Sequence, residues 1–145
     1  MKLVVQRVSR ASVFVGDKSV GKIGKGLFVL VGVRRGDNKE DVKNLAEKLS
    51  KLRIMADGLD KMNLSVKDVS GKMLVVSQFT LYSNTLKGNR PSFIEAAEPA
   101  KAVELYDYFV KKLTEREVEV ETGVFGANMI IETDLDGPVT IIMEK

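Results

Sequence analysis

The chain has 145 residues and a formal net charge of +3, and it contains neither histidine nor cysteine. Without histidine, no side chain titrates near neutral pH in its unperturbed state, which excludes histidine-dependent catalytic triads. Zinc sites built from thiolates or imidazoles are excluded as well. Any catalysis must therefore use backbone amides, hydroxyls, carboxylates, lysines or groups of the substrate.

The length suits a single domain over residues 1–145, and a hydrophobic content of 44% provides a sizeable core. The longest apolar run, residues 26–33, is far shorter than the ~20 residues that cross a bilayer. We therefore expect a cytoplasmic protein that does not use a membrane. The mild positive charge permits a polyanionic partner without requiring one.

Short runs of apolar residues separated by glycine-containing turns fill the first third of the chain. They predict strands near residues 3–7, 12–15, 20–23 and 27–33, which together indicate a β-meander. Later runs predict strands near 53–55, 62–66, 73–80, 118–120, 129–133 and 139–143, with a last turn at Asp136-Gly137-Pro138.

Two segments show the apolar spacing of amphipathic helices. The first follows a candidate N-cap at residues 36–38, and the second begins near Pro99. Their apolar stripes are Val42, Leu45, Ala46, Leu49 and Leu52 in the first, and Val103, Tyr106, Phe109, Val110 and Leu113 in the second. These features predict an α+β fold with a curved, barrel-like, mostly antiparallel sheet and two main amphipathic helices.

The predicted buried strand over residues 73–80 ends in Ser77, Gln78, Phe79 and Thr80, which expose small polar groups. In one interpretation, the two hydroxyls only satisfy backbone groups at a strand end. In the other, the amides after Gln78 face a cleft and bind a developing oxyanion. Neither hydroxyl has a histidine to remove its proton, so both are weak nucleophiles.

Two other segments also allow a structural and a functional interpretation. Asp136-Gly137-Pro138 is ordinary turn chemistry or, with a cis Gly-Pro bond, a rigid wall with two carbonyls aimed in one direction. Lys87 and Arg90, in a polar loop, either bind phosphates or are simply solvated. The sequence has no phosphate-binding glycine motif and no metal-ligand spacing.

Taken together, these segments resemble the D-aminoacyl-tRNA deacylase family over nearly the whole chain. The matching segments include Gln6-Arg7-Val8, residues 24–27 and 29–33, Lys61–Ser65, Ser77–Tyr82, Arg90–Phe93, Glu121–Gly123, Phe125–Ala127 and Gly137–Thr140. The Ser-Gln-Phe-Thr and Gly-Pro-Val-Thr motifs, in this order and at this chain length, are highly specific.

The resemblance implies an enzyme that hydrolyses the ester between a D-amino acid and the terminal adenosine of tRNA, with no metal or cofactor. It also implies a homodimer in which Gly137 and Pro138 of one subunit, in cis, reach Ser77–Thr80 of the other. The amides of Phe79 and Thr80 would polarise the ester carbonyl, with a covalent role for the Thr80 hydroxyl as the alternative.

The Gly137-Pro138 carbonyls would hold the α-amino group of the substrate and exclude an L side chain. Such a wall cannot reject glycine, so mischarged Gly-tRNA(Ala) is an expected substrate. Phe125 and Met129 either line the adenosine pocket or belong to the core, and Arg7 is expected to help hold the Gly-Pro element. The alternatives are a non-catalytic RNA-binding or interaction module on the same scaffold, and a small structural β-domain.

Overall fold

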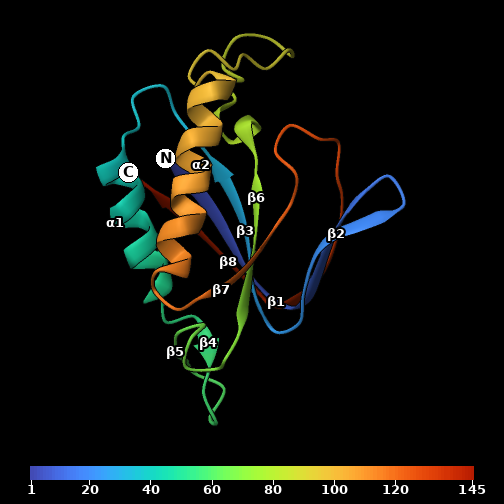
Figure 1. The fold of residues 1–145 in the computed structure, drawn as a ribbon, viewed down its shortest axis with the longest axis vertical. Helices are drawn as coiled ribbons and strands as arrows, with labels where there is room; N and C mark the ends of the chain where they lie inside the picture. Colours follow the sequence, from blue (N-terminus) through green and yellow to red (C-terminus); the bar gives the residue numbers. More distant parts are fainter.

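A computed structural model describes all residues from 1 to 145 (Figure 1). The elements in chain order are β1 (Lys2–Val15), β2 (Lys18–Ile23), β3 (Gly26–Gly32), α1 (Lys39–Ser50), β4 (Met55–Ala56), β5 (Met62–Leu64), β6 (Lys72–Ser77), the 3₁₀ helix η1 (Phe79–Tyr82), α2 (Pro99–Thr114), β7 (Glu119–Thr122) and β8 (Ile130–Glu144). None of the helices is both long enough and apolar enough to cross a membrane.

One curved sheet contains six of the strands, in the order β2-β1-β3-β6-β7, and β8 pairs along β1. The pairs that involve β1 are antiparallel, whereas β3–β6 and β6–β7 are parallel. Two helices and this barrel-like sheet confirm the predicted α+β class. The parallel pairs were not predicted, and they bring the carboxyl ends of β3 and β6 to the same edge of the sheet.

The predicted meander is wrong in its pairing, because β3 returns to β1 rather than to β2. Residues 2–8 of β1 pair with β3, and residues 11–15 pair with β2. A strand of 14 residues is long enough to take two partners one after the other. At Gly21 of β2, an added Cβ would lie 2.5 Å from the Thr122 carbonyl oxygen, so glycine allows β2 to approach β7 and close the barrel.

The sheet separates two apolar clusters. The larger cluster lies between the sheet and the helices α1 and α2, which cover one face (Figure 1). The smaller cluster lies on the opposite face and includes Leu74 and Val76. Successive residues of β6 point to opposite faces, so Met73 and Val75 join the larger cluster and β6 is buried on both sides.

Both predicted helices are confirmed. Asn38 caps α1, and its side chain accepts hydrogen bonds from the Glu40 and Asp41 amides while the Asp41 side chain accepts one from the Asn38 amide. The second helix begins at Pro99, where the missing amide hydrogen costs nothing. Its buried side is centred on Leu105, Phe109 and their neighbours, whereas Val110 is only partly buried.

The predicted last turn at residues 136–138 is wrong, because these residues lie inside the continuous strand β8. Gln6 pairs with Thr140 and Val8 with Leu135, so the four residues 136–139 stand opposite Arg7 alone. The extra residues form a bulge-like irregularity in β8 rather than a hairpin. The bulge contains a cis Gly137-Pro138 bond, and both residues are exposed.

Candidate active site

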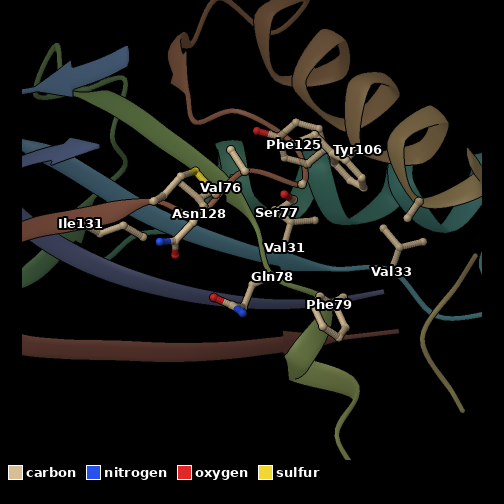
Figure 2. Close-up of a pocket in the computed structure, with 14 residues that line it drawn as sticks. Val31, Val33, Val76, Ser77, Gln78, Phe79, Tyr106, Phe125, Asn128 and Ile131 are labelled. Atoms are coloured by element: carbon tan, nitrogen blue, oxygen red, sulfur yellow. The ribbon is translucent and has the colours of Figure 1, made fainter. Parts of the chain in front are cut away.

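A pocket of about 300 Å³ opens at the edge where the parallel strands β3 and β6 end (Figure 2). Ten of its 14 lining residues are hydrophobic. Val31 and Val33 come from β3 and the segment after it, and Val76 and Ser77 come from the end of β6. A mostly apolar pocket with a few polar groups is typical of a site that binds a small organic group.

The end of β6 supplies the polar side of the pocket. Ser77 is the last residue of the strand, and Gln78 leads into η1, which begins at Phe79. Phe79 and Thr80 are thus the first two residues of a helical turn, and their amides have no acceptor within that turn. The Gln78 side-chain amide donates to Thr80 Oγ1 at 2.5 Å, so this hydroxyl already has a hydrogen-bonding partner.

The segment between β7 and β8 forms the other side of the pocket. Phe125 and Met129 both line it, together with Asn128. In Figure 2, Phe125 lies beside Tyr106 of α2, and Gln78 and Phe79 lie opposite them. The rings of Phe125 and Tyr106 are 6.0 Å apart at their centroids and tilted by 56°.

Tyr106 lines the pocket and is not placed to act as an acid or base there. Its hydroxyl donates to the Val75 carbonyl oxygen at 2.8 Å. Burial raises the pKa of the Tyr106 hydroxyl above its ordinary value. Among the other lining residues, Ser77, Gln78 and Asn128 carry the polar side chains, and none of these titrates near neutral pH.

The bulge in β8 is held by Arg7, which is 8% exposed. Arg7 Nε donates to the Asp136 carbonyl oxygen at 3.0 Å, and Nη1 donates to the Ile54 carbonyl oxygen at 3.0 Å. The guanidinium also forms an ion pair with the Asp136 carboxylate at 3.1 Å. Arg7 therefore fixes the residue directly before Gly137, as the sequence led us to expect.

Gly137 occupies a position that tolerates no side chain. Its φ of +136° lies in the region that favours glycine. An added Cβ would also lie 2.7 Å from the Val139 amide nitrogen. The backbone conformation at residue 137 therefore requires glycine, and Gly137 is also exposed.

The structure brings five of the predicted site residues into one pocket, namely Ser77, Gln78, Phe79, Phe125 and Met129. The side chain of Thr80 lies beside the pocket, and Gly137 and Pro138 do not line the pocket of their own chain. Sequence reasoning missed Asn128 and placed Tyr106 only in the core. The one available signal for Asn128 was its position directly after the matching segment Phe125–Ala127.

Potential metal ligands are not grouped in this fold: no three Asp or Glu side chains lie close enough together to hold an ion. The two glutamates directly before α2 are already paired. Glu95 forms an ion pair with Arg34, and Glu98 forms one with Arg35. The chemistry available at the site is therefore that of backbone amides, one primary hydroxyl and two carboxamides.

Comparison with known proteins agrees with this fold and site. A family model for D-Tyr-tRNA(Tyr) deacylase matches residues 4–144. A D-aminoacyl-tRNA deacylase of Dehalococcoides mccartyi (strain BAV1) is 56% identical over 145 residues, which are 100% of this chain and 95% of the relative. One from Thermotoga petrophila is 54% identical over 100% of this chain and 97% of the relative.

Two solved structures are also similar. A protein described as c-Myc DNA Unwinding Element Binding Protein has a TM-score of 0.93 and 40% identity, with 100% of this chain and 99% of that chain covered. A probable eukaryotic D-amino acid tRNA deacylase has a TM-score of 0.84 at 18% identity, over 98% and 97% of the two chains, and so supports the fold alone.

These matches place the chain among the hydrolases that remove acyl groups. The family model covers the chain nearly from end to end, and the two relatives are more than 50% identical to it, so family membership is established. The chain belongs to the D-Tyr-tRNA(Tyr) deacylase family.

Proposed function

We propose that this chain, acting as a single domain, hydrolyses the ester of D-aminoacyl-tRNA to release a free D-amino acid and tRNA. The observation that carries the proposal is the end of β6, where Ser77, Gln78 and Phe79 open into a mostly apolar pocket of about 300 Å³. Membership of a deacylase family supports the reaction class. The size and lining of the pocket suit the terminal adenosine with its ester.

The amides of Phe79 and Thr80 polarise the ester carbonyl in this mechanism. They are adjacent donors at the start of η1, and neither has an acceptor within that turn. Such donors stabilise the negative charge that develops on the carbonyl oxygen when water attacks. An aminoacyl ester is labile already, so orientation and polarisation supply most of what the reaction needs.

No side chain of the pocket is a strong base, so the substrate must help to activate the water. The ribose hydroxyl next to the ester is the group placed to do so. The Thr80 hydroxyl serves to position rather than to attack, because its partner is the carboxamide of Gln78 and that group cannot remove its proton. Phe125 and Met129 then hold the adenine by stacking and apolar contact.

Selection of the D form requires a second copy of the chain. Gly137 and Pro138 are exposed and lie outside the pocket of their own chain. The outer edge of β8 pairs with no strand of this chain, and three large apolar side chains of β8 are exposed: Ile130, Leu135 and Ile142. These features support a homodimer in which the bulge of one subunit enters the pocket of the other.

In such a dimer, the exposed carbonyls of Gly137 and Pro138 accept hydrogen bonds from the α-ammonium group of the substrate. An L side chain then points into the bulge and is excluded, whereas a D side chain points away from it. Glycine has no side chain to exclude, so mischarged Gly-tRNA(Ala) is also a substrate.

The test is the release of amino acid from D-Tyr-tRNA, L-Tyr-tRNA and Gly-tRNA(Ala), each measured with a chelator present. We expect D-tyrosine and glycine to be released well above the rate without protein, and L-tyrosine to be released at that background rate. Equal release of D- and L-tyrosine would refute the chiral gate. Binding of D-Tyr-tRNA without any release would favour a non-catalytic RNA-binding module.

A further inference from the structure

An exposed aromatic pair stands at the rim of the pocket. The rings of Phe79 and Phe93 meet edge to face, with centroids 5.1 Å apart and an angle of 69°. Phe79 is 56% exposed and Phe93 is 37% exposed, although large aromatic side chains are usually buried in cores. Phe79 lines the pocket and Phe93 does not, so the pair extends from the pocket onto the adjoining surface.

The loop that carries Phe93 is positively charged. Residues 84–93 contain Lys87 and Arg90 and no acidic residue. Both cations are exposed and neither forms an ion pair, whereas Arg34 and Arg35 nearby in the fold are each paired with a glutamate. Unpaired cations beside exposed aromatic rings are the usual composition of a surface that binds single-stranded nucleic acid.

The base of the loop is fixed, so the position of Phe93 is defined. The Asn84 amide donates to the Ser92 carbonyl oxygen at 2.8 Å, and the Ser92 amide donates back to the Asn84 carbonyl oxygen at 2.9 Å. This pair of hydrogen bonds lies directly before Phe93. In Figure 1, the loop extends from the same end of the sheet at which β6 ends.

We propose that Phe79 and Phe93 form a stacking platform for the nucleotide that precedes the terminal adenosine, and that Lys87 and Arg90 bind the phosphates of this single-stranded RNA end. The inference rests on the proposed function, because it assigns the next part of the same substrate. Phe125 lies across the pocket from Phe79 (Figure 2). When the adenine is held at Phe125, the RNA chain therefore leaves the pocket on the side of Phe79, and the preceding nucleotide lies on the Phe79 ring.

The test compares two small substrates, 3′-D-tyrosyl-adenosine and the dinucleotide cytidylyl-adenosine with the same 3′-D-tyrosyl ester. We expect the wild-type protein to hydrolyse both at similar kcat, with a KM about 5- to 150-fold lower for the dinucleotide, which is the range expected for one stacked base. Phe93→Ala should remove most of this advantage and leave kcat/KM on 3′-D-tyrosyl-adenosine unchanged.

Two further variants separate stacking from a structural effect. Phe93→Trp should restore the low KM, because indole also stacks on a base. Leu86→Ala is the matched control, because Leu86 is 90% exposed in the same loop but is neither aromatic nor charged, and it should leave both substrates unaffected. On full D-Tyr-tRNA, Lys87→Gln with Arg90→Gln should raise KM and flatten its dependence on salt.

The possible failures are distinguishable. Equal KM for the two substrates in the wild-type protein overturns the platform and leaves the deacylase function standing. A parallel loss on both substrates in Phe93→Ala overturns it too, because the residue then acts on the fold or the pocket. If neither substrate is hydrolysed, and D-Tyr-tRNA is not hydrolysed either, the proposed function itself fails and the platform fails with it.

Discussion

A mixture of two impaired variants tests whether each active site is shared between subunits. The first variant, Phe79→Pro, removes the amide hydrogen at the first position of η1, where proline fits. The preceding residue, Gln78, has φ −145° and ψ 85°, outside the α region that a following proline disfavours. The second variant, Gly137→Ala, places a Cβ 2.7 Å from the Val139 amide nitrogen and so displaces the bulge.

The magnitude for each variant follows from its contact. Loss of one oxyanion donor typically reduces kcat by about 10²- to 10³-fold, which is the expectation for Phe79→Pro. Phe79→Ala is the matched control, because it removes the same ring but keeps the amide and should retain most of kcat. Gly137→Ala should lower kcat/KM for D-Tyr-tRNA and weaken the discrimination against L-Tyr-tRNA.

Each variant alone keeps half of the proposed site. In a heterodimer, the intact pocket of the Gly137→Ala subunit receives the intact bulge of the Phe79→Pro subunit, and the reciprocal site has neither part. Random assortment of equal amounts makes half of the dimers mixed, each with one working site of two. The mixed dimers should therefore contribute about a quarter of the wild-type activity, in addition to what each variant shows alone.

The assay is release of D-tyrosine from D-Tyr-tRNA after the two purified variants are unfolded together and refolded, with each variant refolded alone as the control. Gel filtration and light scattering of the refolded samples report whether dimers have formed. A mixture no more active than the average of the two variants, in a sample that is fully dimeric, would refute a bulge supplied by the second subunit.

The other two predictions concern pH and the residue behind the bulge. None of the side chains that line the pocket titrates between pH 5 and 9, and burial raises the pKa of Tyr106 further. The profile of kcat/KM against pH should therefore show only the inflection of the substrate's α-amino group, with kcat/KM falling as the α-ammonium group that the bulge carbonyls hold loses its proton. A bell-shaped profile with an acid limb near pH 6 would contradict this. In the variant Arg7→Lys, the lysine cannot bridge the Asp136 and Ile54 carbonyl oxygens at once, and one hydrogen bond from a charged donor contributes about 1.5–3 kcal/mol to stability. This variant should therefore melt several degrees lower and lose discrimination against L-Tyr-tRNA. An unchanged ratio of the D-Tyr-tRNA rate to the L-Tyr-tRNA rate would show that Arg7 acts on stability alone.

Local signals in the sequence were sufficient for the helices but not for the end of β6. Asn38 with Asp41 is a capping pattern within four residues, and proline at position 99 marks the start of a helix, so both boundaries follow from neighbouring residues. The predicted strand over residues 73–80 is wrong at its end, because β6 stops at Ser77 and Phe79 and Thr80 belong to η1. Phe79 and Thr80 are residues typical of strands, so the local sequence carried no sign of this stop.

The pairing of the strands could not be predicted from local sequence signals in the same way. Residues 27–31 and 73–77 pair in parallel across more than 40 positions, and each run is simply apolar because both of its faces are covered. A run of this kind carries no periodicity to identify its partner. The bulge at residues 136–139 was read as a turn because Asp-Gly-Pro is common in turns, and only the pairing of β8 with β1 on both sides shows otherwise.

The same reasoning explains why the site gave little signal of its own. A side chain that performs chemistry is visible in a sequence, but a backbone amide or carbonyl is present at nearly every position. The proposed donors at Phe79 and Thr80 and the proposed acceptors at Gly137 and Pro138 are main-chain atoms. What identifies them is the geometry that requires particular residues nearby: a strand that ends at Ser77, and a position at residue 137 where a Cβ would meet the next amide. Exclusion of an L side chain by such atoms is steric, so it needs no titratable group of the protein, and a protein without histidine can perform it.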